Sequence, residues 1–179
     1  MSDRVEREVT NGPTIEPQVV ANLYASYMSV AFAGMKGDSM DDNVDTFACA
    51  ANPIGFGLVV GRTAPFVLTI QPGGTAPVGI SLHDHIIASR GGYAQYDAVS
   101  VMNRGKVWCQ CSAATNVEDG TYVRFDPATG QVNTTGTILS NAVFRSKAIS
   151  VYDITYTTTT LIALVEMHYG LAINTGTIT

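Results

Sequence analysis

Apolar and polar residues alternate in short runs along most of the chain after residue 54, and turn-forming residues separate the runs. A period of two places successive side chains on opposite faces of a strand, and the runs are rich in Val, Ile, Thr and aromatic residues, which favour strands. The runs are residues 56–60, 66–70, 78–87, 98–102, 106–111, 121–125, 142–157 and 161–169. The pattern predicts an all-β fold, a single antiparallel sandwich or barrel, for which a jelly roll is one arrangement.

The first of two predicted hairpins pairs residues 98–102 with residues 106–111. Each run has one apolar face, and Asn103-Arg104-Gly105 separates them. Glycine adopts the left-handed backbone conformation without a steric cost, so these three residues suit a tight turn. We therefore expect the two runs to be adjacent antiparallel strands.

The second predicted hairpin starts with the strand at residues 121–125. The next five residues, 126–130, read Asp-Pro-Ala-Thr-Gly. Proline fits the second position of a turn, and glycine closes it. Residues 131–133 are then expected to be the return strand.

The N-terminal part of the chain follows a different pattern. Residues 1–17 mix charges with prolines, and residues 19–32 are rich in apolar residues without a regular period. Four aspartates make residues 37–45 a predicted exposed loop. We predict an extended N-terminal arm or strap over residues 1–33 and one β-rich core domain over residues 34–179.

The charge of the chain limits its partners. Only 14% of the 179 residues are charged, against roughly a quarter in an average soluble domain. The net charge is −5 and the basic residues are scattered, whereas nucleic-acid binding requires clustered Lys and Arg. We therefore expect no nucleic-acid partner, and the weakly charged surface suits burial against another protein.

Cysteine use and hydropathy indicate where the protein is made. Three cysteines cannot all pair within one chain, and the spacing of Cys109 and Cys111 fits no zinc motif. Residues 18–35 carry no charge, but polar residues interrupt them and the charges before them cancel. Neither a signal peptide nor a membrane span is predicted, and we expect reduced thiols in a protein made in the cytoplasm.

His83 and His85 are the strongest candidates for a metal site. On a strand these alternate residues would point to the same side and could bind one metal ion. No carboxylate follows within a few residues, and His168, the third histidine, is far away in the sequence. A polar or interfacial face explains the pair better, so we expect no metal, no cofactor and no catalytic residues.

Trp108 lies on the face opposite Val107 in its predicted strand. Tryptophan is enriched among residues that dominate protein interfaces. Trp108 is therefore either a partly exposed anchor for a partner or a residue beneath a second covered face of the sheet.

Several segments together carry a resemblance to a known family. They are Gly34-Met35 before the acidic loop, residues 54–60 (IGFGLVV), 79–82 (GISL), 91–108 (GGYAQYDAVSVMNRGKVW) and 123–130 (VRFDPATG). In this order and spacing, which cover most of residues 34–133, the chain resembles the structural cement (head decoration) proteins of tailed bacteriophages.

The resemblance implies a small β protein of the virion, commonly a homo-oligomer (dimer or trimer). Such a protein sits on the outer capsid surface and bridges subunits of the major capsid protein. On this basis the uncharged strap is the expected contact with the capsid or with another subunit. The expected contact residues are Val19, Tyr24, Tyr27, Phe32 and Trp108.

Two other functions stay open from the sequence. One is a metal-dependent small-molecule enzyme on a jelly roll, using His83, His85 and His168. The other is a phage tail or receptor-binding component, because all-β folds and Thr-rich surfaces occur there as well. A fold alone does not decide between these functions.

Overall fold

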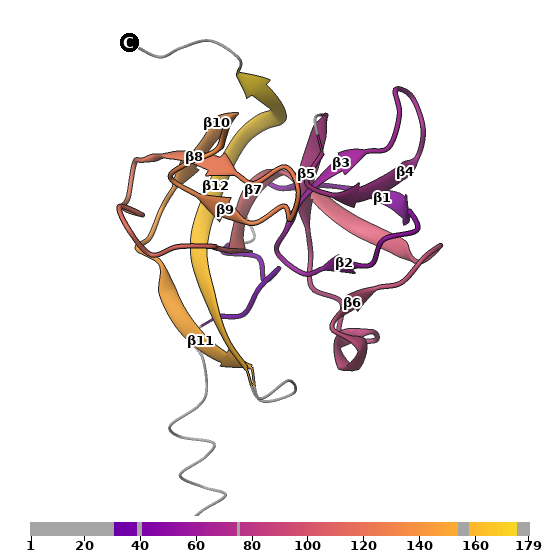
Figure 1. Cartoon of the computed structure of the whole chain (residues 1–179), viewed down its shortest axis with the longest axis horizontal. Coiled ribbons are helices and arrows are strands. Elements are labelled where there is room, and N and C mark those ends of the chain that lie inside the picture. Colours follow the sequence, from indigo (N-terminus) through magenta and orange to yellow (C-terminus); the bar gives the residue numbers. More distant parts are fainter. Residues whose placement is uncertain (1–30, 39–40, 75, 154–157, 175–179) are drawn as a thin grey trace, which may run out of the picture.

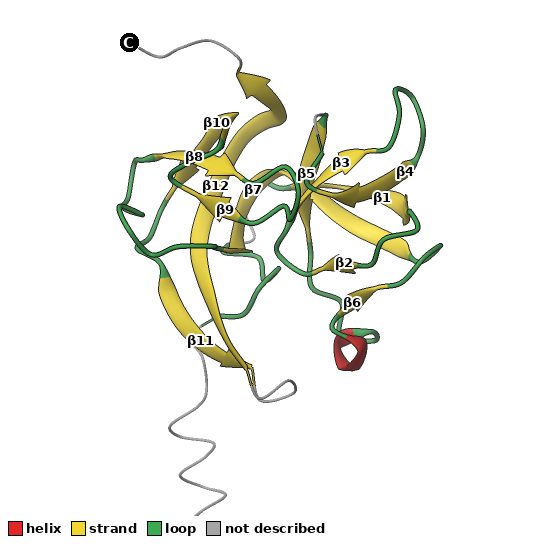
Figure 2. Cartoon of the chain, in the orientation of Figure 1, coloured by secondary structure: helices red, strands yellow, loops and turns green. Residues whose placement is uncertain are grey.

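A computed structural model describes residues 31–38, 41–74, 76–153 and 158–174, and nearly all of its regular structure is β-strand. Figures 1 and 2 show two groups of strands side by side. The strands are β1 (Asn43–Cys49), β2 (Ile54–Gly55), β3 (Val59–Arg62), β4 (Thr69–Pro72), β5 (Pro77–Ser81), β6 (Gly92–Tyr93), β7 (Ala98–Gln110), β8 (Tyr122–Phe125), β9 (Val132–Asn133), β10 (Thr137–Phe144), β11 (Ile149–Asp153) and β12 (Thr158–Asn174). A short 3-10 helix, η1 (Ala88–Arg90), precedes β6. The all-β prediction is confirmed.

Five strands close into a barrel. They pair in the order β1, β4, β3, β5 and β7, and β7 pairs with β1 to complete the ring. All these pairings are antiparallel except β1 with β4, where Ala48 lies opposite Thr69 in a parallel register. The barrel interior is filled by large apolar side chains, among them Phe47, Val60, Ile70 and Val101.

Strand β7 also starts a second sheet that packs on the outside of the barrel, while β2 and β6 pair only with each other. The order of the second sheet is β7, β12, β10, β8 and β9, with β11 paired to the first part of β12. Side chains alternate along β3, so Val60 lies in the barrel core while Val59 belongs to the core shared with the second sheet. That shared core includes Phe125 and Val165.

The first predicted hairpin is wrong, because β7 continues without a turn. Its first part pairs with β1 and β5 in the barrel, and residues 105–110 pair with β12 in the second sheet. The register to β1 skips Asn103, so the strand bulges there, and Gly105 has a φ of 117°. Glycine and two polar residues suit a bulge as well as a turn, and here the bulge carries one strand from one sheet to the next.

The second predicted hairpin is confirmed, since β8 and β9 pair in antiparallel register. The Asp126 carboxylate accepts hydrogen bonds from the Ala128 backbone N–H and the Thr129 hydroxyl. Gly130, at a φ of 76°, closes the turn by donating its N–H to the Asp126 carbonyl.

Other predicted strand limits change in the structure. The run at residues 78–87 ends as a strand at Ser81, and the run at residues 142–157 is divided between β10 and β11. Strand β1 begins inside the predicted acidic loop. Among the described residues, no helix has the length and hydrophobicity needed to cross a membrane.

Candidate interaction surface

Residues 31–37, which we call the arm root, connect residues 1–30 to the core along β7. The Gly34 backbone N–H donates to the Trp108 carbonyl at 2.7 Å, and the Trp108 N–H donates to the Met35 carbonyl at 2.9 Å. Gly37 continues the series with a 2.7 Å bond to the Lys106 carbonyl. The arm root therefore lies along the second half of β7 like a short added strand.

Apolar packing holds the arm root against the second sheet. Ala31 is buried together with Val151 and Ile162, and Ala33, Met35, Trp108 and Ile149 pack around them. The half-buried Trp108 thus lies directly at the contact with the arm root. The predicted boundary between residues 33 and 34 thus falls within a segment that is packed on the core.

Phe32 lies in a small cluster of aromatic rings beside the arm root. Its ring centroid is 4.5 Å from that of His83 and 6.3 Å from that of His85. His83 also contacts Phe56 at 4.6 Å, and its backbone N–H donates to the Gly34 carbonyl. These rings cover part of Phe32, which keeps 39% of its surface exposed.

The histidines expected to share a strand face lie instead in the loop after β5. His83 and His85 do come together, with ring centroids 4.8 Å apart. His168 is exposed on β12 and lines a different pocket. Within the part of the chain that the structure describes, no three His, Cys, Asp or Glu side chains gather as a metal site would require.

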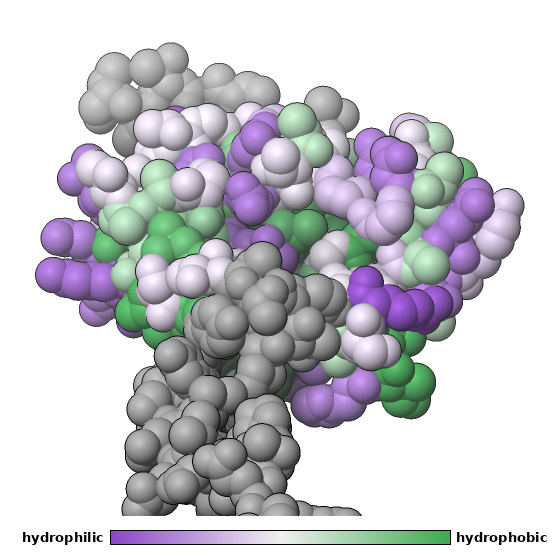
Figure 3. Space-filling model, turned by 60° about the horizontal axis from the view of Figure 1, so that its bottom comes forward, coloured by the Kyte–Doolittle hydropathy of each residue, from purple (hydrophilic) through white to green (hydrophobic). Residues whose placement is uncertain are grey.

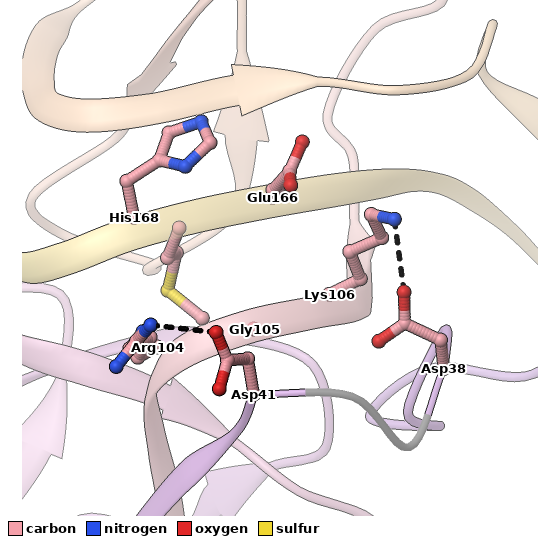
Figure 4. A pocket seen from close by; sticks show the side chains of 8 residues that line it. Asp38, Asp41, Arg104, Gly105, Lys106, Glu166 and His168 are labelled. Atoms are coloured by element: carbon pink, nitrogen blue, oxygen red, sulfur yellow. Dashed lines mark hydrogen bonds and ion pairs between the residues drawn. The ribbon is translucent and has the colours of Figure 1, made fainter.

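That pocket, of about 380 Å³, is lined by charged side chains of the acidic loop, β7 and β12. Lys106 pairs with Asp38 at 2.9 Å and Arg104 pairs with Asp41 at 2.8 Å, as Figure 4 shows. The bond to Asp38 raises the pKa of Lys106. These pairs fix the acidic loop onto β7, which continues the attachment that the arm root begins.

The cysteines are free and buried at positions 49, 109 and 111. Burial raises the pKa of Cys109 well above its ordinary value. A thiol held in its protonated form is a poor nucleophile. The prediction that Cys109 and Cys111 act as small buried side chains is confirmed.

Several large apolar side chains are exposed on the barrel. The most exposed are Phe66, Leu68, Ile86 and Tyr96, and sequence reasoning did not select any of them. Figure 3 shows that hydrophobic surface is broken into separate patches on the face in view, with one at the lower right on the barrel's side. Of the predicted contact residues, Val19, Tyr24 and Tyr27 lie outside the described residues.

Comparison with known proteins gives a family and a fold. Residues 20–167 match the family model described as structural cement protein (E217 gp24/Pam3 gp6). A chain from the solved structure titled "The capsid of Myoviridae Phage XM1" is similar in fold, with a TM-score of 0.58 and 19% identity over 77% of this chain and 90% of that chain. No curated protein sequence matches.

Proposed function

This chain belongs to the structural cement protein family of phages, with a structural role in the capsid, and on that premise we propose that it binds the outer surface of the head and bridges neighbouring copies of the major capsid protein. The family match over residues 20–167 is the observation that carries the proposal. The match begins within the predicted arm and continues through both sheets. It therefore extends beyond residues 34–133, on which the sequence resemblance rests.

The arm is proposed as one contact with the capsid. The strap residues Val19, Tyr24 and Tyr27 belong to a stretch without charge, so that removing water from it costs little. The half-exposed Phe32 ring would continue that contact at the arm root. The arm root itself supports this proposal, because it anchors the C-terminal end of the arm to the second sheet by both hydrogen bonds and apolar packing.

Stabilisation of the head would follow from linkage. A protein that binds the assembled lattice better than the separate capsid subunits shifts the equilibrium toward the lattice. Each contact can have a modest affinity, since a dimer or trimer of this chain would bind several capsid subunits at a raised effective concentration. We therefore propose a homo-oligomer in a virion, with no cofactor involved.

The proposal is tested by adding purified protein to phage heads that lack it and imaging them by electron cryomicroscopy. We expect density on the outside of the shell that joins neighbouring capsid subunits. Density only inside the shell or at the tail would contradict the proposal.

A deletion of residues 1–30 tests the role of the arm. It leaves the arm root in place, whereas a deletion of residues 1–33 would also remove the buried Ala31 and the Phe32 ring. We expect the shortened chain to unfold at the same temperature as the full chain but to cosediment with heads at least tenfold less well. Unchanged cosedimentation would exclude the arm as a contact.

A further inference from the structure

Two turns at one end of the barrel hold aromatic rings in solvent. Phe66, in the loop between β3 and β4, is 93% exposed, and Tyr96, in the turn before β7, is 81% exposed. Leu68, near Phe66, is 70% exposed. We call these three side chains the barrel tip.

Both aromatic residues occupy a backbone conformation that disfavours them. In the turn from Ala64 to Val67, the Val67 N–H donates to the Ala64 carbonyl, and Phe66 at the third position has a φ of 63°. The turn from Ala94 to Asp97 has the same pattern, with Tyr96 at a φ of 70°. A turn with positive φ at its third position normally carries glycine or asparagine there.

This choice of residue distinguishes the two turns from the rest of the described chain. The other non-glycine residues with positive φ in that part are Asp41, Asn116 and Asn141. Asp and Asn tolerate this conformation, but bulky side chains do not. Because each ring is exposed, packing within the described fold does not offset the backbone strain. This indicates that the ring contacts a partner.

Both turns are held firmly. The Asp97 carboxylate accepts hydrogen bonds from the Ala94 backbone N–H at 2.8 Å and from Arg90 at 2.9 Å. The loop with Phe66 is closed by a 2.8 Å bond between the hydroxyls of Thr63 and Thr69. These bonds restrain the backbone of both turns, which reduces the conformational entropy lost when the rings bind.

The segments that carry the two turns are both hydrogen-bonded to the end of β1. The Ala48 N–H donates to the Leu68 carbonyl, while the next residue, Cys49, donates to the Asp97 carbonyl and accepts from the Tyr96 N–H. The end of β1 thus lies between the two turns. Residues 63–71 and 91–96 contain no charge, which keeps the cost of removing water from this end of the barrel low.

We propose that the barrel tip is a second attachment site, at which the Phe66 and Tyr96 rings and Leu68 insert into apolar pockets on the major capsid protein. The inference rests on the proposed cement function. Aromatic anchors that fill pockets on a partner are typical of the residues that dominate binding energy.

The position of the barrel tip fits a bridging protein. Strand β7 starts beside the barrel tip at Ala98 and reaches the arm root at Trp108. At ~3.3 Å per residue the two ends lie about 30 Å apart along the strand. One chain would thus hold two separate contacts, and figure 1 places the barrel loops on the right and the second sheet on the left.

The small size of the barrel tip favours the capsid over a second copy of this chain as its occupant. Three largely exposed large side chains offer on the order of 500 Å², whereas a stable interface in solution buries about 800 Å² per partner. A contact of this size becomes useful when a lattice and a second attachment site multiply it.

The test uses the full chain with Phe66→Asn and Tyr96→Asn together. Asparagine suits the positive φ at both turns, so the double variant should keep its fold by circular dichroism and its oligomeric mass by light scattering. We expect at least a tenfold loss of affinity for heads that lack the protein. Tyr122→Asn is the matched control, because Tyr122 is an exposed aromatic residue (58%) in the second sheet. The affinity of this variant for heads should equal that of the unchanged chain.

Each other outcome overturns the inference in a distinct way. Unchanged affinity of the double variant would show that the capsid does not use the barrel tip. A smaller oligomeric mass would assign the barrel tip to contacts between copies of this chain. If the unchanged chain does not bind heads at all, the proposed function fails together with the inference, whereas binding by the unchanged chain and the double variant alike sinks only the inference.

Discussion

Phe66 holds a left-handed backbone conformation without any packing gain from its ring, which is 93% exposed. Such strain costs of the order of 1–3 kcal/mol. We predict that Phe66→Asn raises the free energy of unfolding by about 1 kcal/mol, measured by urea denaturation.

Phe66→Ala is the control for that prediction. Alanine removes the ring but, unlike asparagine, gains nothing at positive φ, so it should not stabilise the chain. A stability gain from alanine equal to that from asparagine would attribute the effect to loss of the exposed ring and not to strain.

The buried thiols give the fold a pH dependence on the alkaline side. Burial raises the pKa of Cys109, and to a lesser degree those of Cys49 and Cys111. As the pH rises above about 8.5, thiols of the unfolded chain lose their protons first. The folded state then holds more protons than the unfolded state, so the free energy of unfolding should fall as the pH rises from 8 to 10.

Cys109→Ala should make that fall less steep, because the variant removes the most strongly shifted thiol. Urea denaturation at several pH values between 7 and 10 measures how the free energy of unfolding changes with pH in the variant and in the unchanged chain. An identical slope in the variant would mean that other groups cause the dependence.

At the scale of elements, β7 depends on Gly105. A Cβ at this position would lie 3.1 Å from Asp42 Cβ and 3.3 Å from Met102 Sδ, at a φ of 117°. We predict that Gly105→Ala lowers the free energy of unfolding by about 2 kcal/mol, measured by urea denaturation. Gly120→Ala is the comparison. Gly120 also has a positive φ, but a Cβ added there would have no atom within 4 Å. Gly120→Ala should therefore lower the free energy of unfolding by less than Gly105→Ala.

The sequence pattern predicted which segments are strands better than it predicted their partners. The Asp-Pro-Ala-Thr-Gly turn has a local cause and was predicted correctly. Pairing of β7 with β1 and β12 joins segments far apart in the chain. Local turn residues carry no information about such pairing. Strand β1 was missed because its first four residues are exposed and three of them are polar. Hydrogen bonds from β4 and β7 on either side make it a strand.

The candidate surface was predictable only where composition marks it. The absence of charge in residues 18–35 pointed to the strap. Phe66 looked like an ordinary strand residue, although Pro65 before it suits the second position of a turn and was the available clue. Tyr96 offered no such clue, since its exposure follows from a turn that closes across the end of β1.

At the scale of the whole molecule, the side chains proposed to make both contacts are uncharged. Contacts between uncharged surfaces are little affected by salt, whereas charged ones weaken as ions screen them. We predict that affinity for heads changes by less than about threefold between 50 and 500 mM NaCl, measured by cosedimentation. A steep loss of affinity with rising salt would indicate that the charged residues around Asp38 and Lys106 make the contact instead.

The bulge at Asn103 keeps β7 a single strand from the barrel tip to the arm root, and this has a mechanical consequence. A pull between those two ends runs along the strand, whose backbone carries the load, and the hydrogen bonds that join the arm root to β7 are loaded in shear and must break together. A pull across a sheet would open its bonds one after another. Single molecules stretched between the barrel tip and the arm root should therefore rupture in one high-force step, as the proposed bridging of capsid subunits requires.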